Sequence, residues 1–147
     1  MKKKLALIIV IFFTLLFIDI NTYSAGKTIT LRLDANKNCL NEKREGEYLM
    51  TRLKPKTRYF VQMTGSAWLS YDTGHRADPV YGLMTYYRTF ENGQSVDSYR
   101  VIRSGDRFVF TSAQDKPFFV GFIMEIYSQR NNHGTFVVTI RELGPAN

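Results

Sequence analysis

The sequence predicts an all-β domain, a two-sheet antiparallel sandwich or jelly roll of about eight strands. Eight segments of strand length are rich in β-branched and aromatic residues or alternate apolar with polar side chains, and nearly all Gly and Pro residues fall between them. No segment of the mature chain has an apolar repeat of helical period. Two packed sheets bury the apolar faces of eight strands better than one open sheet does.

The expected strands follow one another with short polar connections, except for one long irregular connection over residues 65–82. The Pro-containing turn at 54–57 predicts a hairpin between the strands that flank it. Asn92-Gly93 predicts a second, tight hairpin. The most continuously apolar strand is expected to be central and buried on both faces. The eight expected strands are 28–33, 47–53, 58–64, 83–90, 95–102, 107–111, 118–127 and 135–143.

The start of the chain is typical of an export signal. Three lysines at 2–4 precede an apolar run over 5–18, and small residues follow at Ser24 and Ala25. The run is shorter than the roughly 20 residues that span a bilayer. We therefore expect a signal peptide over 1–25 and a secreted, periplasmic or extracellular domain over 26–147 with no stable membrane span. An uncleaved anchor is the alternative, because Tyr23 stands where signal cleavage prefers a small residue.

Composition narrows the classes of partner. The 147-residue chain has a net charge of +7, and removing three lysines and one aspartate with residues 1–25 leaves 17 basic and 12 acidic residues, or +5. The basic residues are interspersed with acidic and apolar ones, so nucleic-acid binding is not expected. Cys39 is the only cysteine, which excludes an internal disulfide and favours a buried thiol. The sequence leaves the oligomeric state open.

Nothing in the sequence indicates an enzyme. His75 and His133 lack the spacing of a catalytic triad or a metal pair. Asp72 and Asp78 could form the carboxylate pair of a glycosidase, which keeps a hydrolase as an alternative. Two acids in one loop more often form turns, however, so we predict a protein without catalytic activity.

Two connections carry the groups that binding chemistry needs. Residues 68–82 and 128–134 are rich in carboxylate, carboxamide and hydroxyl groups, and Trp68 lies in the first of them. Oxygen-rich loops suit calcium, and the same groups beside an aromatic ring suit a sugar. The plainer interpretation is that Asn, Asp and Gly form turns and that Trp68 anchors the core.

Four short motifs occur in a characteristic order: Gly65 with Trp-x-Ser-Tyr at 68–71, x-Pro-x-x-Gly-Leu at 78–83, Ile-Tyr at 126–127 and Asn-Asn-x-Gly-x-Phe at 131–136. By these motifs, Lys54 to Ile140 resembles the small calcium-dependent, galactose-binding bacterial lectins of the PA-IL (LecA) type. The resemblance implies a compact jelly-roll domain in which a sugar bridges a bound calcium ion.

The resemblance also implies site residues. The calcium ligands would be the carbonyl of Tyr71 and the side chains of Asn131 and Asn132, but Gln129 stands where the family has an aspartate. Losing the charged ligand weakens a calcium site. The sugar-contacting histidine and aspartate of the family correspond to Asp78 and Val80, so those contacts differ as well.

The leading expectation is a lectin-like domain that binds a glycan or glycoconjugate between the two loops. Its sugar contacts would come from Asp78, Tyr81, Asn131 and Asn132, with a weak calcium ion as the only cofactor. The alternative is a β-sandwich interaction module of the cell envelope that has lost sugar and calcium binding.

Overall fold

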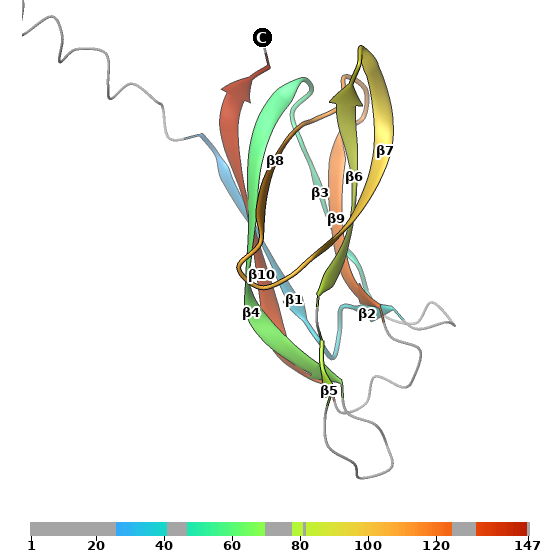
Figure 1. The fold of residues 1–147 in the computed structure, drawn as a ribbon, viewed down its shortest axis with the longest axis vertical. Coiled ribbons are helices and arrows are strands. Elements are labelled where there is room, and N and C mark those ends of the chain that lie inside the picture. Colours follow the sequence, from blue (N-terminus) through green and yellow to red (C-terminus); the bar gives the residue numbers. More distant parts are fainter. Residues whose placement is uncertain (1–25, 41–46, 70–77, 81, 125–131, 147) are drawn as a thin grey trace, which may run out of the picture.

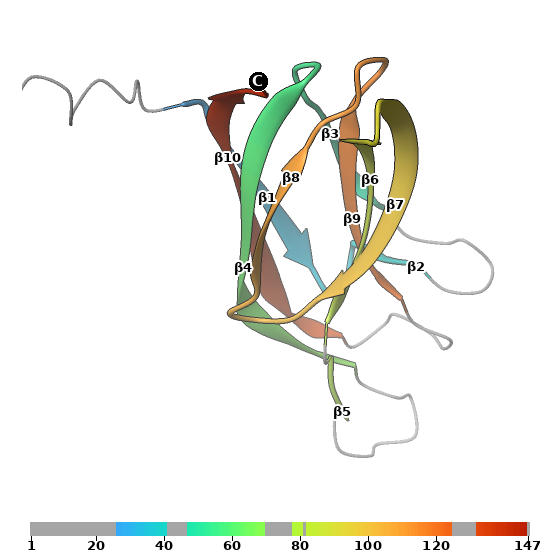
Figure 2. The same ribbon diagram turned by 45° about the horizontal axis from the view of Figure 1, so that its top comes forward.

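The computed structural model of the chain describes residues 26–40, 47–69, 78–80, 82–124 and 132–146. Within these ranges the chain forms strands in two sheets that face each other, which confirms the predicted β-sandwich (Figures 1 and 2). The first sheet has the order β1-β10-β4-β5, and β8 also pairs with β4. Its strands are β1 (Thr28–Asp34), β4 (Thr57–Leu69), β5 (Asp78–Pro79), β8 (Arg107–Thr111) and β10 (His133–Pro145).

The second sheet has the order β2-β9-β6-β7, and β3 also pairs with β9. Neighbouring strands run antiparallel, except that β2 runs parallel to β9. Its strands are β2 (Cys39–Leu40), β3 (Leu49–Arg52), β6 (Leu83–Glu91), β7 (Gln94–Ile102) and β9 (Phe118–Met124). The eight long strands match the predicted segments, and the two-residue strands β2 and β5 were not expected.

The core lies between the sheets because side chains alternate between the two faces of each strand. The first sheet contributes fully buried residues such as Val61 and Phe136, and the second contributes Leu83, Phe119 and Ile123. Each such side chain stabilises the fold by about 1.5–3 kcal/mol relative to exposure. Cys39 belongs to the same cluster, which confirms that its thiol is buried.

The strand β4 is longer than the sequence indicates. It continues through Gly65 to Leu69, into the segment that was expected to be irregular. Gly65 has a φ of 96°, and a Cβ there would overlap the carbonyl oxygen of Thr135 on β10. Glycine therefore allows β4 to approach β10 closely and to go on pairing beyond this point.

Of the two predicted hairpins, the structure contains the one at Asn92-Gly93 but not the one at 54–57. Asn92 and Gly93 have φ values of 49° and 83°, as the turn of a tight hairpin requires, and β6 pairs with β7 across them. The predicted hairpin at 54–57 is wrong, because β3 belongs to the second sheet and β4 to the first. The backbone of this turn bonds instead to the segment after β8: Lys56 N donates to Ala113 O at 3.2 Å.

The apolar strand β9 is central, with β6 on one side and β3 and β2 on the other. It is not buried on both faces as predicted. Phe118 and Phe122 are only half-buried, and Met124 is 61% exposed. Residues 125–127, predicted as part of this strand, lie outside the described residues, as does the expected signal peptide. No helix in the described part of the chain has the length and apolar character of a membrane span.

Ser112 joins the two sheets at the end of the sandwich that carries the β6–β7 hairpin, which we call the far end. Its buried hydroxyl accepts a hydrogen bond from Thr57 N at 3.0 Å and donates one to Lys54 O at 2.5 Å. Ser112 also forms an isolated β-bridge with Thr89 of β6. The Ser112 side chain thus holds the crossing at Lys54 to Thr57, while its backbone pairs with the second sheet at Thr89.

Replacing Ser112 tests this junction. Ser112→Ala leaves the Thr57 N–H and the Lys54 carbonyl without their partner, and we expect a loss of about 1–3 kcal/mol in the free energy of unfolding. Urea unfolding measures it. The matched change Ser104→Ala, at an exposed turn position, is expected to stay within about 0.5 kcal/mol of the parent. Equal effects of the two substitutions would contradict the role of Ser112.

A second prediction concerns the approach of β4 to β10. Gly65→Ala should lower the free energy of unfolding by about 2–3 kcal/mol, because the new Cβ meets backbone as well as an unfavourable φ. Gly105→Ala is the matched control, since Gly105 has a similar φ of 91° but open space around its Cα. We expect about 1 kcal/mol there. A Gly65→Ala loss no larger than that of the control would show that the approach is not tight.

Candidate functional site

The end of the sandwich opposite the Ser112 junction brings together three strands that flank the predicted binding loops. Trp68 of β4 lies opposite His133 of β10 on one side and opposite Pro79 of β5 on the other. Leu69 lies opposite Asp78. We call this region, shown beside β5 in Figure 1, the site end. The antiparallel pairing of β4 with β10 thus places Trp68 and His133, 65 positions apart in the sequence, next to each other.

Trp68 and His133 form a stacked pair of rings at the site end. Their ring centroids are 5.3 Å apart and their planes differ by 10°. The stack follows from the register, since residues directly opposite each other on antiparallel strands point to the same face. His133 is exposed and Trp68 is partly exposed. Trp68 is not a member of the buried core cluster, so the interpretation of Trp68 as a core anchor is wrong.

Asn132 is the one predicted metal and sugar ligand whose side chain the structure describes. It is 5% exposed, and its Nδ2 donates a 3.4 Å hydrogen bond to Ala35 O. Ala35 in turn donates its N–H to Gly134 O at 3.1 Å. Asn132 therefore holds the start of β10 against the turn that follows β1. A ligand at this position would share the carboxamide with that contact.

The other predicted site residues are placed only in part. Asp78 lies at the start of β5, where its backbone pairs with Leu69, and its side chain is not described. Tyr81, an expected sugar contact, lies outside the described residues. So do the expected calcium ligands Tyr71 and Asn131, and Gln129, which stands in place of the family's aspartate. Asp72, which with Asp78 would form the carboxylate pair of the hydrolase alternative, lies outside the described residues as well, as does His75.

The donor chemistry of the implied calcium site fits the ion poorly. Tyr71 would supply a carbonyl, and Asn131, Asn132 and Gln129 would supply amide oxygens, so no ligand in the set carries a charge. Calcium sites in proteins depend on carboxylates for affinity. Among the described residues no three His, Cys, Asp or Glu side chains gather closely enough to hold a metal.

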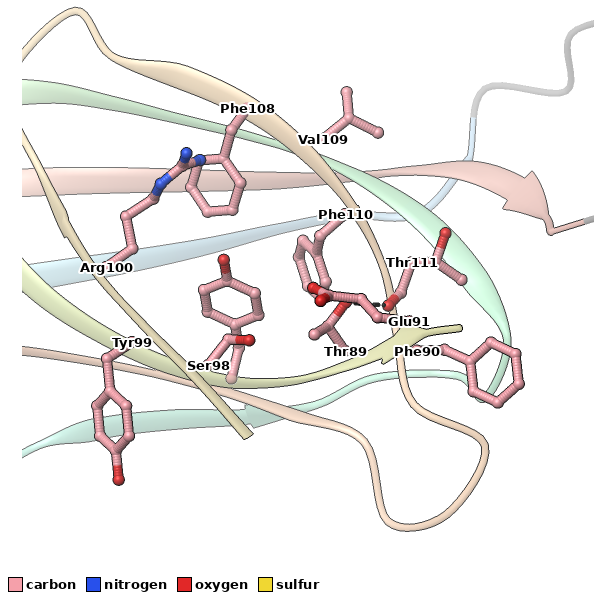
Figure 3. Close-up of a pocket in the computed structure, with 11 residues that line it drawn as sticks. Thr89, Phe90, Glu91, Ser98, Tyr99, Arg100, Phe108, Val109, Phe110 and Thr111 are labelled. Atoms are coloured by element: carbon pink, nitrogen blue, oxygen red, sulfur yellow. Dashed lines mark hydrogen bonds between the residues drawn. The ribbon is translucent and has the colours of Figure 1, made fainter. Parts of the chain in front are cut away.

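A groove on the open side of the sandwich was not predicted from the sequence. It has a volume of about 540 Å³ and lies between β6 and β7 of one sheet and β8 of the other (Figure 3). Within the described strands, β7 pairs only with β6 and β8 only with β4, so the sheets part here. Its position depends on which strand edges become neighbours, and no sequence motif marks that.

The groove combines aromatic and polar groups. Arg100 extends over the ring of Phe108, with 4.5 Å between the guanidinium carbon and the ring centroid. Tyr87 is 8% exposed, and burial raises the pKa of its hydroxyl, an effect that the charge of Arg100 partly opposes. The Tyr87 hydroxyl is thus protonated at neutral pH. Glu91 and Thr89 line the same groove, so it is a second place where a polar ligand with an apolar face could bind.

No protein-family model matches this chain, and neither does any curated protein. The resemblance to calcium-dependent galactose-binding lectins is therefore one of four short motifs alone. The β-sandwich itself rests on the structure.

Proposed function

We propose that this protein is an exported carbohydrate-binding domain whose sugar site lies at the site end. The observation that carries the proposal is the stack of Trp68 on an exposed His133, at the point where β4 meets β5 and β10. The motif resemblance supports the same location. The outer face of the second sheet favours another role, that of an interaction module.

The stacked pair suits a sugar for a physical reason. One face of a pyranose carries C–H groups and packs on a flat ring, and the hydroxyls around its edge need polar partners. The indole behind His133 fixes the orientation of the imidazole, so its exposed face is ordered before a ligand arrives. Pre-ordering reduces the entropy lost on binding. Asp78 and Asn131 would then supply hydroxyl contacts beside the ring.

Calcium has at most a small role in this proposal. The implied ligands are neutral, and the Asn132 carboxamide also contacts the backbone of Ala35. The sugar would be held by side chains of the chain itself. In this respect the protein departs from the lectins that it resembles.

The alternative function is an interaction module without a sugar site. The observation that favours it is the apolar outer face of the second sheet, where Tyr99 is 69% exposed and Met124 is 61% exposed. Exposed apolar patches of this kind mark contacts with other macromolecules. The two functions use different surfaces, so each can be tested separately.

Glycan binding tests the proposal. On a glycan array, the protein is expected to bind at least one galactose-containing or related glycan. His133→Ala should weaken binding to that glycan about two- to tenfold, since an aromatic contact contributes roughly 0.5–1.5 kcal/mol. His133→Phe keeps a ring and should retain most of the affinity.

Two control variants locate the site. Gln94→Ala, at the exposed hairpin of the far end, should bind as the parent does. Arg100→Ala, in the groove of Figure 3, should also leave binding unchanged. If Arg100→Ala abolishes binding and His133→Ala does not, the groove is the site and the site-end location is wrong. If the parent binds no glycan, carbohydrate binding itself is wrong.

A calcium titration tests the metal independently. A ligand that binds only the folded state raises the melting temperature by an amount set by its concentration over its Kd. Because the implied ligands carry no charge, we expect 1 mM calcium to shift the melting temperature by less than about 1 °C. Glycan binding should likewise survive a chelator. A clear rise in Tm with calcium, or loss of binding with chelator, would show that a functional calcium site exists.

A further inference from the structure

The outer face of the second sheet is built mainly from large apolar and aromatic side chains, and its polar members are Arg52, Arg88, Ser95 and Asp97. Five of them are more than half exposed: Tyr48 at 57%, Met50 at 53%, Tyr99 at 69%, Val101 at 57% and Met124 at 61%. Partly exposed residues of β6 and β9 lie between them. We call this surface the aromatic face; it comprises Tyr48, Met50, Met84, Tyr86, Tyr99, Val101, Phe118, Val120, Phe122 and Met124.

The outer face of the first sheet has the opposite character. Threonine, serine, glutamine and arginine dominate it, as is usual for a sheet with one face in water. The apolar members of this face are Phe60, Val109 and Val137, and its polar members are Thr28, Thr30, Arg32, Arg58, Gln62, Thr64, Ser66, Thr135, Thr139 and Arg141. The aromatic face is thus a property of one sheet, and a general tolerance of exposed apolar residues does not account for it.

The aromatic face is also ordered. Tyr86 stacks on Tyr99 with 4.6 Å between ring centroids and meets Phe118 edge-on at 5.0 Å. The Tyr86 hydroxyl donates a 2.7 Å hydrogen bond to Asp97, which also binds Arg88 Nε at 2.9 Å. These contacts fix the rings from one border. The centre of the face is a shallow apolar hollow of about 320 Å³ lined by residues that include Tyr86 and Val120.

We propose that a second copy of this chain covers the aromatic face, so that the protein is a dimer through face-to-face packing of its second sheets. The area supports this occupant. With roughly 200 Å² for a fully exposed side chain of this size, the five most exposed residues present about 600 Å². A standard interface takes about 800 Å² from each partner, and the partly exposed residues between them supply the remainder.

A copy of the same sheet is a suitable complement in shape and charge. A two-fold contact uses one patch twice, and two antiparallel sheets pack with their apolar faces about 10 Å apart. The charges at the border include Arg88 with its two acidic partners Asp97 and Asp115, and Arg52 and Lys116 beside Met50 and Phe118. Charges of both signs are thus interspersed along this border, whereas the rim of a surface that binds anionic membranes is strongly basic.

The aromatic face is separate from the proposed sugar site. The site end is formed by β4, β5 and β10 of the first sheet, and the aromatic face belongs to β3, β6, β7 and β9. Dimerisation would leave both sugar sites accessible. Two linked sites would raise the apparent affinity for a surface that displays many glycans.

Sedimentation velocity under reducing conditions tests the dimer, with protein produced from the full-length gene and studied from about 1 to 100 μM. We expect twice the monomer mass at the upper concentrations. The double variant Met50→Lys/Tyr99→Lys places two positive charges on opposite sides of the face. It should raise the dimer Kd at least a hundredfold, so that the variant sediments as a monomer. Thermal unfolding of each variant shows whether it folds.

Val109→Lys is the matched control. Val109 is 48% exposed on the outer face of the first sheet, so this change adds the same charge elsewhere and should leave the dimer intact. A monomeric parent at 100 μM overturns the proposal, as does a Met50→Lys/Tyr99→Lys variant that still sediments as a dimer. Parent protein that stays monomeric but binds phosphatidylglycerol vesicles would assign the face to a membrane and would overturn it too.

Discussion

The pairing of β4 with β10 is the constraint on which the rest of the structure depends. These two strands are paired from Trp68 with His133 at one end to Thr57 with Pro145 at the other. Their register sets which residues face the core and which rings stack at the site end. Gly65 makes it possible, because any larger residue would meet the backbone of β10. A shift of one residue would turn every core side chain of the pair toward solvent.

The second sheet is attached to this pair unevenly. At the far end, Ser112 and the Lys56–Ala113 backbone contact join the sheets. Along the side of β7 and β8 the sheets part and leave a groove. The two sheets are therefore joined at the far end and part along β7 and β8, and the predicted binding loops adjoin the strands of the site end.

The sequence predicted the strands well because alternation and turn residues are local signals. The extension of β4 beyond Gly65 was not predicted, because a glycine that follows a run of strand length usually indicates the end of the strand. The close approach of β10, which explains this glycine, is not visible in the sequence. The sequence placed Trp68 and His133 in loops, whereas they lie in β4 and β10, and it could not show that they stack, because that requires the β4–β10 register. For β9, apolar residues at every position hid which face was outward, so Phe118 and Phe122 were expected to be buried.

The unpaired edges of β7 and β8 bear on how the protein stays in solution. An exposed edge strand offers its free N–H and C=O groups to any neighbouring chain, and charged side chains are a common protection. Exposed Asp97 and Arg100 lie along β7, and Arg107 begins β8. A strand from another molecule would have to desolvate these charges before it could pair. Arg100, which also lines the groove, thus opposes fibril-like growth of the sheets from this side.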